Sequence, residues 1–156
     1  MEITEATLLS LKNYVRYKNL IPKHDCYWWL KSSLYILDDY KRCSTVVDNH
    51  GDLHLCNVAY DFGVSPALKI SDLKSSDYQI GDKFEFGEHT FTIISDTLAQ
   101  CNDIIGKCSF NRNRSLDNKT ATKYKNSDIK KIIDKWYDKS LEKIKSEEKE
   151  EEVELE

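Results

Sequence analysis

The chain has 156 residues, of which 40% are hydrophobic, 11% aromatic and 32% charged, and its formal net charge is −4. This length is typical of one domain, and the apolar content excludes a wholly disordered chain. No apolar run approaches the roughly 18 residues of a membrane span, and the acidic residues 1–5 lack the profile of a secretory signal. We therefore expect neither a membrane span nor an export signal here, and the sequence assigns no compartment.

Cysteine usage favours free thiols over a disulfide scaffold. An odd number of cysteines without paired spacing argues against a framework of bridges. Free cysteines often behave as small buried hydrophobic residues. The cysteine usage therefore weakly favours a reducing compartment. The five are Cys26, Cys43, Cys56, Cys101 and Cys108.

Residues 4–18 are the first predicted element, a short helix. Leucines and tyrosines form a broad apolar face there, and Thr4 is the expected N-cap. Residues 27–31 form a continuous aromatic and aliphatic run, which predicts a strand covered on both faces.

The next stretch predicts a β-hairpin and a further strand. The β-rich runs 44–48 and 53–59 flank a tight polar turn that contains Gly51. Residues 64–70 predict another strand, which Pro66 places at an edge or an irregularity.

The second half begins with a polar linker at residues 71–78. Phenylalanines and isoleucines then alternate with polar residues over 83–86 and 90–94, which predicts a hairpin with one buried face. Residues 98–105 predict a weaker third strand. Residues 107–125 are rich in Asn, Arg, Lys and Thr, and we expect a polar loop.

Residues 127–144 show the clearest helical pattern in the chain. Ser127 is the expected N-cap, and Asp128 suits the first turn. Apolar residues recur with helical spacing, which predicts one buried stripe. The stripe consists of Ile129, Ile132, Ile133, Trp136, Tyr137, Leu141 and Ile144.

Charge is uneven in the C-terminal part. Residues 107–145 hold twelve Lys and Arg against five Asp and Glu, whereas residues 146–156 hold seven Glu and one Lys. Because like charges repel, we expect the acidic tail to fray or to be disordered.

A family resemblance rests on two segments of the first half. Tyr27-Trp28-Trp29-Leu30-Lys31-Ser32 is followed by a hairpin turn at residues 47–53 and then by Gly63-Val64-Ser65-Pro66-Ala67-Leu68. These segments resemble an uncharacterised bacterial domain family with Trp-Trp-Leu-Arg-Ser and Gly-Val-Arg-Pro-Ala motifs. The resemblance implies the C-type-lectin-like fold that sulfatase-modifying enzymes share with bacterial and phage ligand-display proteins. Lys31 and Ser65 stand where the family has arginine, so any role of those arginines is not carried over.

The second half resembles the N-terminal part of the same family. Residues 80–94 look like its opening hairpin, and residues 124–133 look like the start of its helix. The two halves therefore stand in reversed order. A circular permutation or a chain boundary out of phase with a tandem array is favoured, and pairing of halves between chains is the third account.

Two parts of the sequence contain residue types that bind metals. His24, Cys26, Cys43, His54 and Cys56 offer soft ligands, but the paired spacing of structural zinc knuckles is absent. The polar turn at residues 48–52 lacks the length and the bidentate Glu of a calcium loop. We therefore predict no metal site and no cofactor.

Ligand contacts are predicted at four side chains. One of Trp28 and Trp29 could stack on a sugar, although core packing is the more common role of such residues. Arg112 and Arg114 could contact phosphates or an acidic partner, although a solvated surface is more common. No catalytic residue is predicted, because no activating pattern surrounds any cysteine.

Together these patterns predict an α+β fold, with antiparallel hairpins forming small sheets flanked by two helices. We expect one domain over residues 1–145, built from half-units 1–70 and 79–145, with Trp28 or Trp29 and the stripe of the last helix in a common core.

For function, the resemblance and the lack of a catalytic motif favour a non-enzymatic binding or display module that recognises a protein or a glycan. The alternative is an enzyme analogous to sulfatase-modifying proteins that uses a cysteine. A cleft with a cysteine beside a histidine or lysine would favour this enzyme, whereas buried, dispersed cysteines would favour the module. A contact of residues 107–145 with nucleic acid or an acidic partner is a weaker reading.

Overall fold

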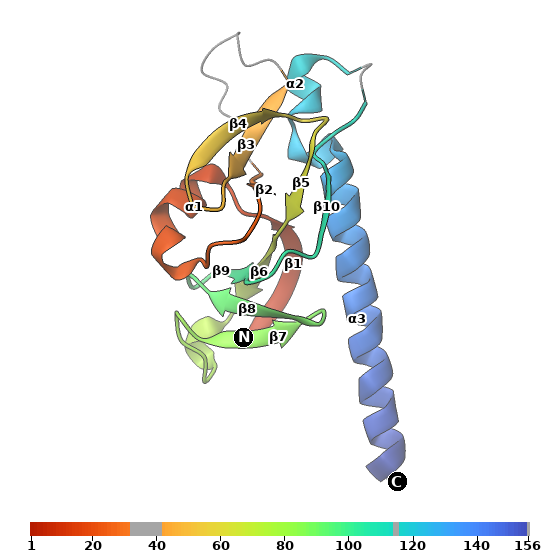
Figure 1. Ribbon diagram of the computed structural model, residues 1–156. Helices are drawn as coiled ribbons and strands as arrows, with labels where there is room; N and C mark the ends of the chain where they lie inside the picture. Colours follow the sequence, from red (N-terminus) through yellow and green to blue (C-terminus); the bar gives the residue numbers. More distant parts are fainter. Residues whose placement is uncertain (32–41, 114–115, 156) are drawn as a thin grey trace.

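Two five-stranded sheets with mainly antiparallel pairing make up the body of the protein (Figure 1). The structure is a computed structural model that describes residues 1–31, 42–113 and 116–155. It confirms the mixed α+β class. The long helix α3 (Asp128–Leu155) lies along one side of the sheets and packs against β1 (Figure 1).

The first sheet has the order β1-β6-β9-β8-β7. Its strands are β1 (Glu2–Leu8), β6 (Pro66–Ser71), β9 (Leu98–Cys101), β8 (His89–Ile93) and β7 (Lys83–Phe86). The hairpin predicted at residues 83–94 is confirmed, because β7 and β8 pair antiparallel with Phe84 opposite Phe91.

The second sheet has the order β10-β5-β2-β3-β4. Its strands are β10 (Gly106–Ser109), β5 (Asp61–Val64), β2 (Trp28–Trp29), β3 (Cys43–Val47) and β4 (Leu53–Asn57). The first predicted hairpin is also confirmed, since β3 and β4 pair antiparallel around the turn that contains Gly51.

The predicted strand 64–70 is two strands in two sheets. The chain leaves β5 at Val64 and enters β6 at Pro66, which is the first residue of its strand, a position that tolerates a missing N–H. Ser65 lies between them and is buried. Its hydroxyl donates to the carbonyl of Cys101 at 3.2 Å, and the Gln100 amide donates to the Ser65 carbonyl and hydroxyl at 3.1 and 2.9 Å.

The helix predicted for residues 4–18 is wrong over its first half. Residues 2–8 form β1, and the helix α1 covers only Leu11–Tyr17 with Ser10 as its N-cap in place of Thr4. The Ser10 hydroxyl accepts the Asn13 N–H at 3.1 Å. β1 pairs with β6 along its length, and this distant partner overrides the local helical pattern.

The segment between residues 98 and 125 is more regular than expected. The predicted third strand ends at Cys101, and the chain then forms β10 and pairs with β5. The predicted polar loop contains most of β10 and a short helix, α2 (Asn118–Ala121), whose N-cap Asp117 accepts the Thr120 N–H. Among the described residues, 3-10 turns lie at Lys18–Leu20, Leu73–Ser75 and Tyr124–Asn126.

The N-cap predicted for the last helix is confirmed, since the Ser127 hydroxyl accepts the Lys130 N–H at 3.1 Å. Ile129 and Ile133 are fully buried, whereas Ile132 and Ile144, also predicted for the stripe, are 42% and 36% exposed. The helix continues through the acidic tail to Leu155, in contrast to the expected fraying (Figure 1). No helix in the described ranges combines the length and the apolar character that a membrane crossing needs.

The two tryptophans of β2 face opposite sides of their strand, and both are buried. Trp29 packs in the larger core with Ile129 and Ile133, as expected for one of the pair. Its indole N–H donates to the carbonyl of Cys108 at 2.9 Å. Trp28 packs in a second, smaller core with Tyr14 and Ile21. Burial on both faces explains why this strand reads as a continuous apolar run.

Candidate ligand-binding pocket

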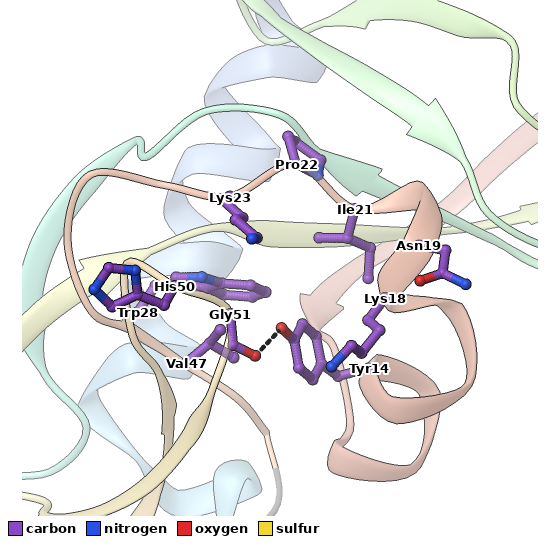
Figure 2. A pocket seen from close by; sticks show the side chains of 10 residues that line it. All are labelled: Tyr14, Lys18, Asn19, Ile21, Pro22, Lys23, Trp28, Val47, His50 and Gly51. Atoms are coloured by element: carbon purple, nitrogen blue, oxygen red, sulfur yellow. Dashed lines mark hydrogen bonds between the residues drawn. The ribbon is translucent and has the colours of Figure 1, made fainter.

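A pocket of about 340 Å³ lies between α1 and the turn of the β3–β4 hairpin (Figure 2). Its walls come from α1 and the following turn, from the loop before β2, and from the hairpin. The ten residues are Tyr14, Lys18, Asn19, Ile21, Pro22, Lys23, Trp28, Val47, His50 and Gly51.

A hydrogen bond joins the two sides of the pocket. The Tyr14 hydroxyl donates to the Gly51 carbonyl at 2.6 Å (Figure 2). Gly51 has a φ of +90°, and a Cβ at this position would lie 3.3 Å from the Tyr14 hydroxyl oxygen. Both the turn conformation and the close approach therefore favour glycine. Burial, followed by the charges of Asp48 and Asp52, raises the pKa of Tyr14, so its phenol stays a donor.

Asp48 fixes the shape of the hairpin turn beside the pocket. Its carboxylate accepts the backbone N–H groups of His50 and Asp52 at 2.8 and 2.9 Å, and it pairs with His54 Nε2 at 2.6 Å. Burial acts to raise the pKa of Asp48. The hydrogen bonds from Asp52, His54 and His50 outweigh burial and lower the pKa to about 2. Asp48 is therefore an anion that its own turn and strand already satisfy.

Two lysines stand at the rim of the pocket, and its floor is apolar. Lys18, Lys23 and His50 are exposed, whereas Trp28 and Val47 are buried beneath them. Within the described ranges, no carboxylate forms an ion pair with Lys18 or Lys23. These two ammonium groups, with which no carboxylate of the described residues pairs, and the apolar floor together suit a small anionic group.

The predicted sugar-stacking tryptophans have no free ring face. Trp28 is 1% exposed and meets Tyr14 and His24 edge-on, with ring centroids 5.8 and 5.3 Å apart. Trp29 is 0% exposed and packs against Phe62 and Phe110. Trp28 still borders the pocket, but as part of its floor.

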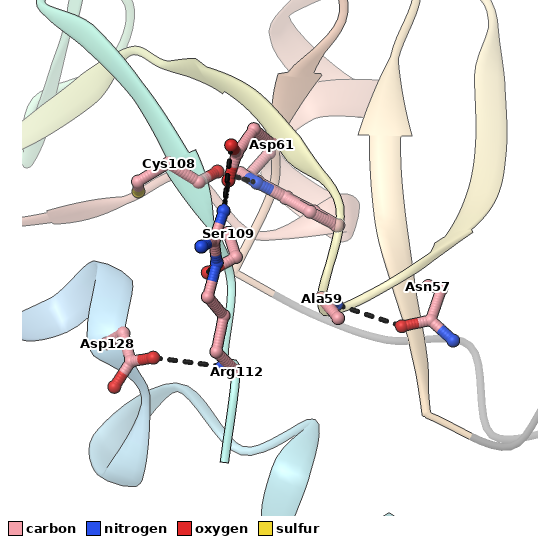
Figure 3. Close-up of polar contacts among 8 residues, drawn as sticks. Asn57, Ala59, Asp61, Cys108, Ser109, Arg112 and Asp128 are labelled. Carbon is pink, nitrogen blue, oxygen red and sulfur yellow. Dashed lines mark hydrogen bonds and ion pairs between the residues drawn. The ribbon is translucent and has the colours of Figure 1, made fainter. Parts of the chain in front are cut away.

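Arg112 forms hydrogen bonds and an ion pair within the protein (Figure 3). Its guanidinium donates to both carboxylate oxygens of Asp61 at 2.7 and 2.8 Å and to the Ser109 hydroxyl at 3.2 Å. Its backbone N–H donates to Asp128 at 2.9 Å. Arg112 thus links β5 and β10 to the start of α3, and its charge is already paired. Arg114, the other predicted contact, lies outside the described residues.

The soft ligands named from the sequence do not converge. No three of His24, Cys26, Cys43, His54 and Cys56, all within the described ranges, bring their ligand atoms close enough to share an ion. His54 is instead engaged by Asp48.

None of the five cysteines, all of which lie in the described ranges, forms a disulfide, and burial disfavours most of their thiolates. It raises the pKa of Cys43, Cys56, Cys101 and Cys108, the last two to about 12 and 11. Cys26 shares a shallow pocket of about 300 Å³ with Lys107. Its sulfur packs beside Gly63, where an added Cβ would lie 3.0 Å away.

The sequence did not predict the pocket residues outside β2 as ligand contacts. Tyr14, Lys18 and Lys23 belong to segments whose meeting with the hairpin turn depends on a contact across 37 positions of the chain. The available signal was the glycine of the turn, which identified a turn and no pocket.

Comparison with protein-family models, with curated proteins and with solved structures finds no match for this chain.

Proposed function

We propose that this protein is a non-enzymatic binding module that recognises an acidic segment of a partner protein through the pocket between α1 and the β3–β4 turn. The observation that carries the proposal is the pair Lys18 and Lys23, which have no ion-pair partner in the described ranges and stand above an apolar floor. An aspartate or glutamate side chain presents a carboxylate on a short apolar stem, which suits both parts of the pocket.

A protein ligand is favoured over a glycan because the pocket offers no exposed aromatic face. Tyr14 and Trp28 are 4% and 1% exposed, and a sugar ring stacks on a face that solvent can reach. A sugar acid shares the carboxylate chemistry, so it is the natural competitor in a test.

The proposal is tested by an NMR titration of the isotope-labelled full chain with a hexaglutamate peptide. We expect saturable shifts at the Gly51 amide and the Trp28 indole, and a Kd that rises with salt. Lys18→Ala combined with Lys23→Ala should weaken binding about tenfold or more. Lys74→Ala combined with Lys83→Ala removes two exposed lysines elsewhere and should leave the Kd unchanged.

Two outcomes would overturn this proposal. Equal loss in both double variants would mean general attraction to positive charge. Saturable binding of a glucuronate oligosaccharide, with none of hexaglutamate, would assign the pocket to a glycan.

We also propose that the protein is related to C-type-lectin-like domains and that its half-units stand in permuted order. Pairing between the halves in both sheets, of β6 with β9 and of β5 with β10, fits half-units that close into one domain. Light scattering on the chain truncated after Ser146 tests closure within one chain. A monomer is expected, whereas a stable dimer would indicate halves exchanged between chains.

A cysteine enzyme is the second candidate, favoured by Cys26 and Lys107 in one shallow pocket. A reactive nucleophile needs an accessible thiolate near positive charge. Alkylation of Cys26 by iodoacetamide at neutral pH much faster than that of free cysteine, and slowed by Lys107→Ala, would support the enzyme over the module.

A further inference from the structure

Three metal-binding side chains of different kinds meet on the first sheet. One ligand atom each from His89, Cys101 and Asp103 lies within 4.8 Å of the other two. None of these residues lines the pocket described above. No other group of three such residues in the described ranges comes as close.

Strand register brings the three together. β8 and β9 pair antiparallel with Phe91 opposite Cys101, so His89 and Asp103 fall opposite each other two residues further along. Alternation along β8 puts His89 and Phe91 on the same face, and Asp103 lies two residues beyond Cys101, the last residue of β9. The histidine and the Cys-x-Asp pair lie twelve residues apart in the sequence, in a spacing that matches no zinc knuckle.

The separations suit a tetrahedral ion. His89 Nδ1 and Asp103 Oδ2 are 3.1 Å apart. Two ligand atoms about 2.0–2.2 Å from a tetrahedral zinc ion lie about 3.4 Å apart, so an ion could enter between them with little movement of the backbone.

The cluster runs from the core to the surface. Cys101 is 0% exposed, whereas the side chains of His89 and Asp103 are 27% and 52% exposed. An ion can therefore reach the site from solvent, and a fourth ligand such as water can complete the coordination.

The sulfur of Cys101 already has a partner that favours its anionic form. Burial raises the pKa of Cys101 to about 12, although a hydrogen bond from the backbone N–H of Asp103 acts in the opposite direction. This N–H can go on donating to a metal-bound thiolate, as outer-shell groups commonly do.

We propose that His89, Cys101 and Asp103 bind a zinc-class divalent ion with three protein ligands and one open position. On binding, the Cys101 thiol releases its proton to solvent and a sulfur–metal bond forms. His89 Nδ1 gives up its hydrogen bond to Asp103 as the ring proton moves through solvent to Nε2. Neutral His89, through Nδ1, and ionised Asp103 then each donate a lone pair, and no group changes its oxidation state. The ion would join β8 to the segment that follows β9.

The test is titration of the reduced, metal-free full chain with Co²⁺, followed by absorption spectroscopy. One equivalent should produce a thiolate-to-cobalt charge-transfer band in the near ultraviolet with the visible bands of a tetrahedral site, and Zn²⁺ should displace it. Zn²⁺ should also raise the Tm of the wild-type chain.

Variants assign the ligands. Cys101→Ser should abolish the thiolate band, and His89→Gln and Asp103→Asn should each weaken Co²⁺ binding by at least about tenfold, the scale on which even outer-shell partners act. The last two changes lie at exposed or half-buried positions, so they remain informative if Cys101→Ser fails to fold. Cys56→Ser and Asp96→Asn are the matched controls and should change nothing.

The proposal is overturned if one equivalent of Co²⁺ gives no thiolate band. It is equally overturned if the band survives unchanged in both His89→Gln and Asp103→Asn, or disappears in Cys56→Ser.

Discussion

Asp48 shows how one residue sets the shape of a pocket that it does not itself line. It uses its carboxylate on two backbone N–H groups and on His54, so the turn that carries His50 and Gly51 is held from inside. Residues of this kind are hard to recognise in a sequence, because an aspartate in a turn usually has only local partners. Here the third partner comes from the next strand.

Replacing Asp48 by asparagine should destabilise the protein and reduce its sensitivity to acid. The pKa of Asp48 is lowered in the folded state to about 2 from an ordinary value of 3.8. Its stabilising effect is therefore complete above the unfolded-state pKa and is lost as the pH falls through the folded-state pKa. The urea midpoint of the wild type should fall between pH 7 and the pH range bounded by these two pKa values. The midpoint of Asp48→Asn should fall less over the same change of pH. Asp96→Asn, at an exposed turn position, should retain the wild-type profile.

The hydrogen bond across the pocket gives a second test on the scale of one residue. Tyr14→Phe removes the donor to the Gly51 carbonyl but keeps the ring that packs on Trp28. We expect a loss of about 0.5–1.5 kcal/mol in the free energy of unfolding, measured by urea denaturation. Tyr17→Phe on the same helix is the control. A loss of the same size there would show that the effect does not come from this bond.

Among the elements, the two hairpins and the last helix followed from the sequence, and β1 did not. A hairpin is specified by alternation and a turn within about a dozen residues, and the helix start by its cap and apolar stripe. β1 depends on pairing with β6, more than fifty residues later. Its local pattern therefore predicted a helix where the protein forms a strand. The pocket and the cluster of His89, Cys101 and Asp103 were missed for the same reason, since each joins separate segments.

The cap of α3 makes a prediction at this scale. Ser127→Ala removes the side-chain acceptor for the Lys130 N–H and should lower the free energy of unfolding by about 1 kcal/mol. Ser146→Ala, in an exposed part of the same helix, should have little effect on stability. If the two variants were equally stable by urea denaturation, the capping assignment would be wrong.

For the whole molecule, the C-terminal half of α3 stands apart from the body. Residues 141–154 are almost all exposed, and Lys143 pairs with Glu88 as one anchor to the sheets. Truncation after Ser146 should therefore leave the urea midpoint nearly unchanged, while the helical circular dichroism decreases. A large drop in the midpoint would mean that the acidic turns stabilise the fold.

The passage of the chain from one sheet to the other at Ser65 has a consequence for folding during synthesis. β6 pairs with β1 and with β9, and β5 pairs with β10. Because β9 and β10 end after residue 100, the first hundred residues alone can complete neither sheet. A nascent chain on the ribosome would expose unpaired strand edges until these late segments emerge. The finished protein should in turn open as one cooperative unit, with slow amides of both sheets exchanging their hydrogens at a common free energy.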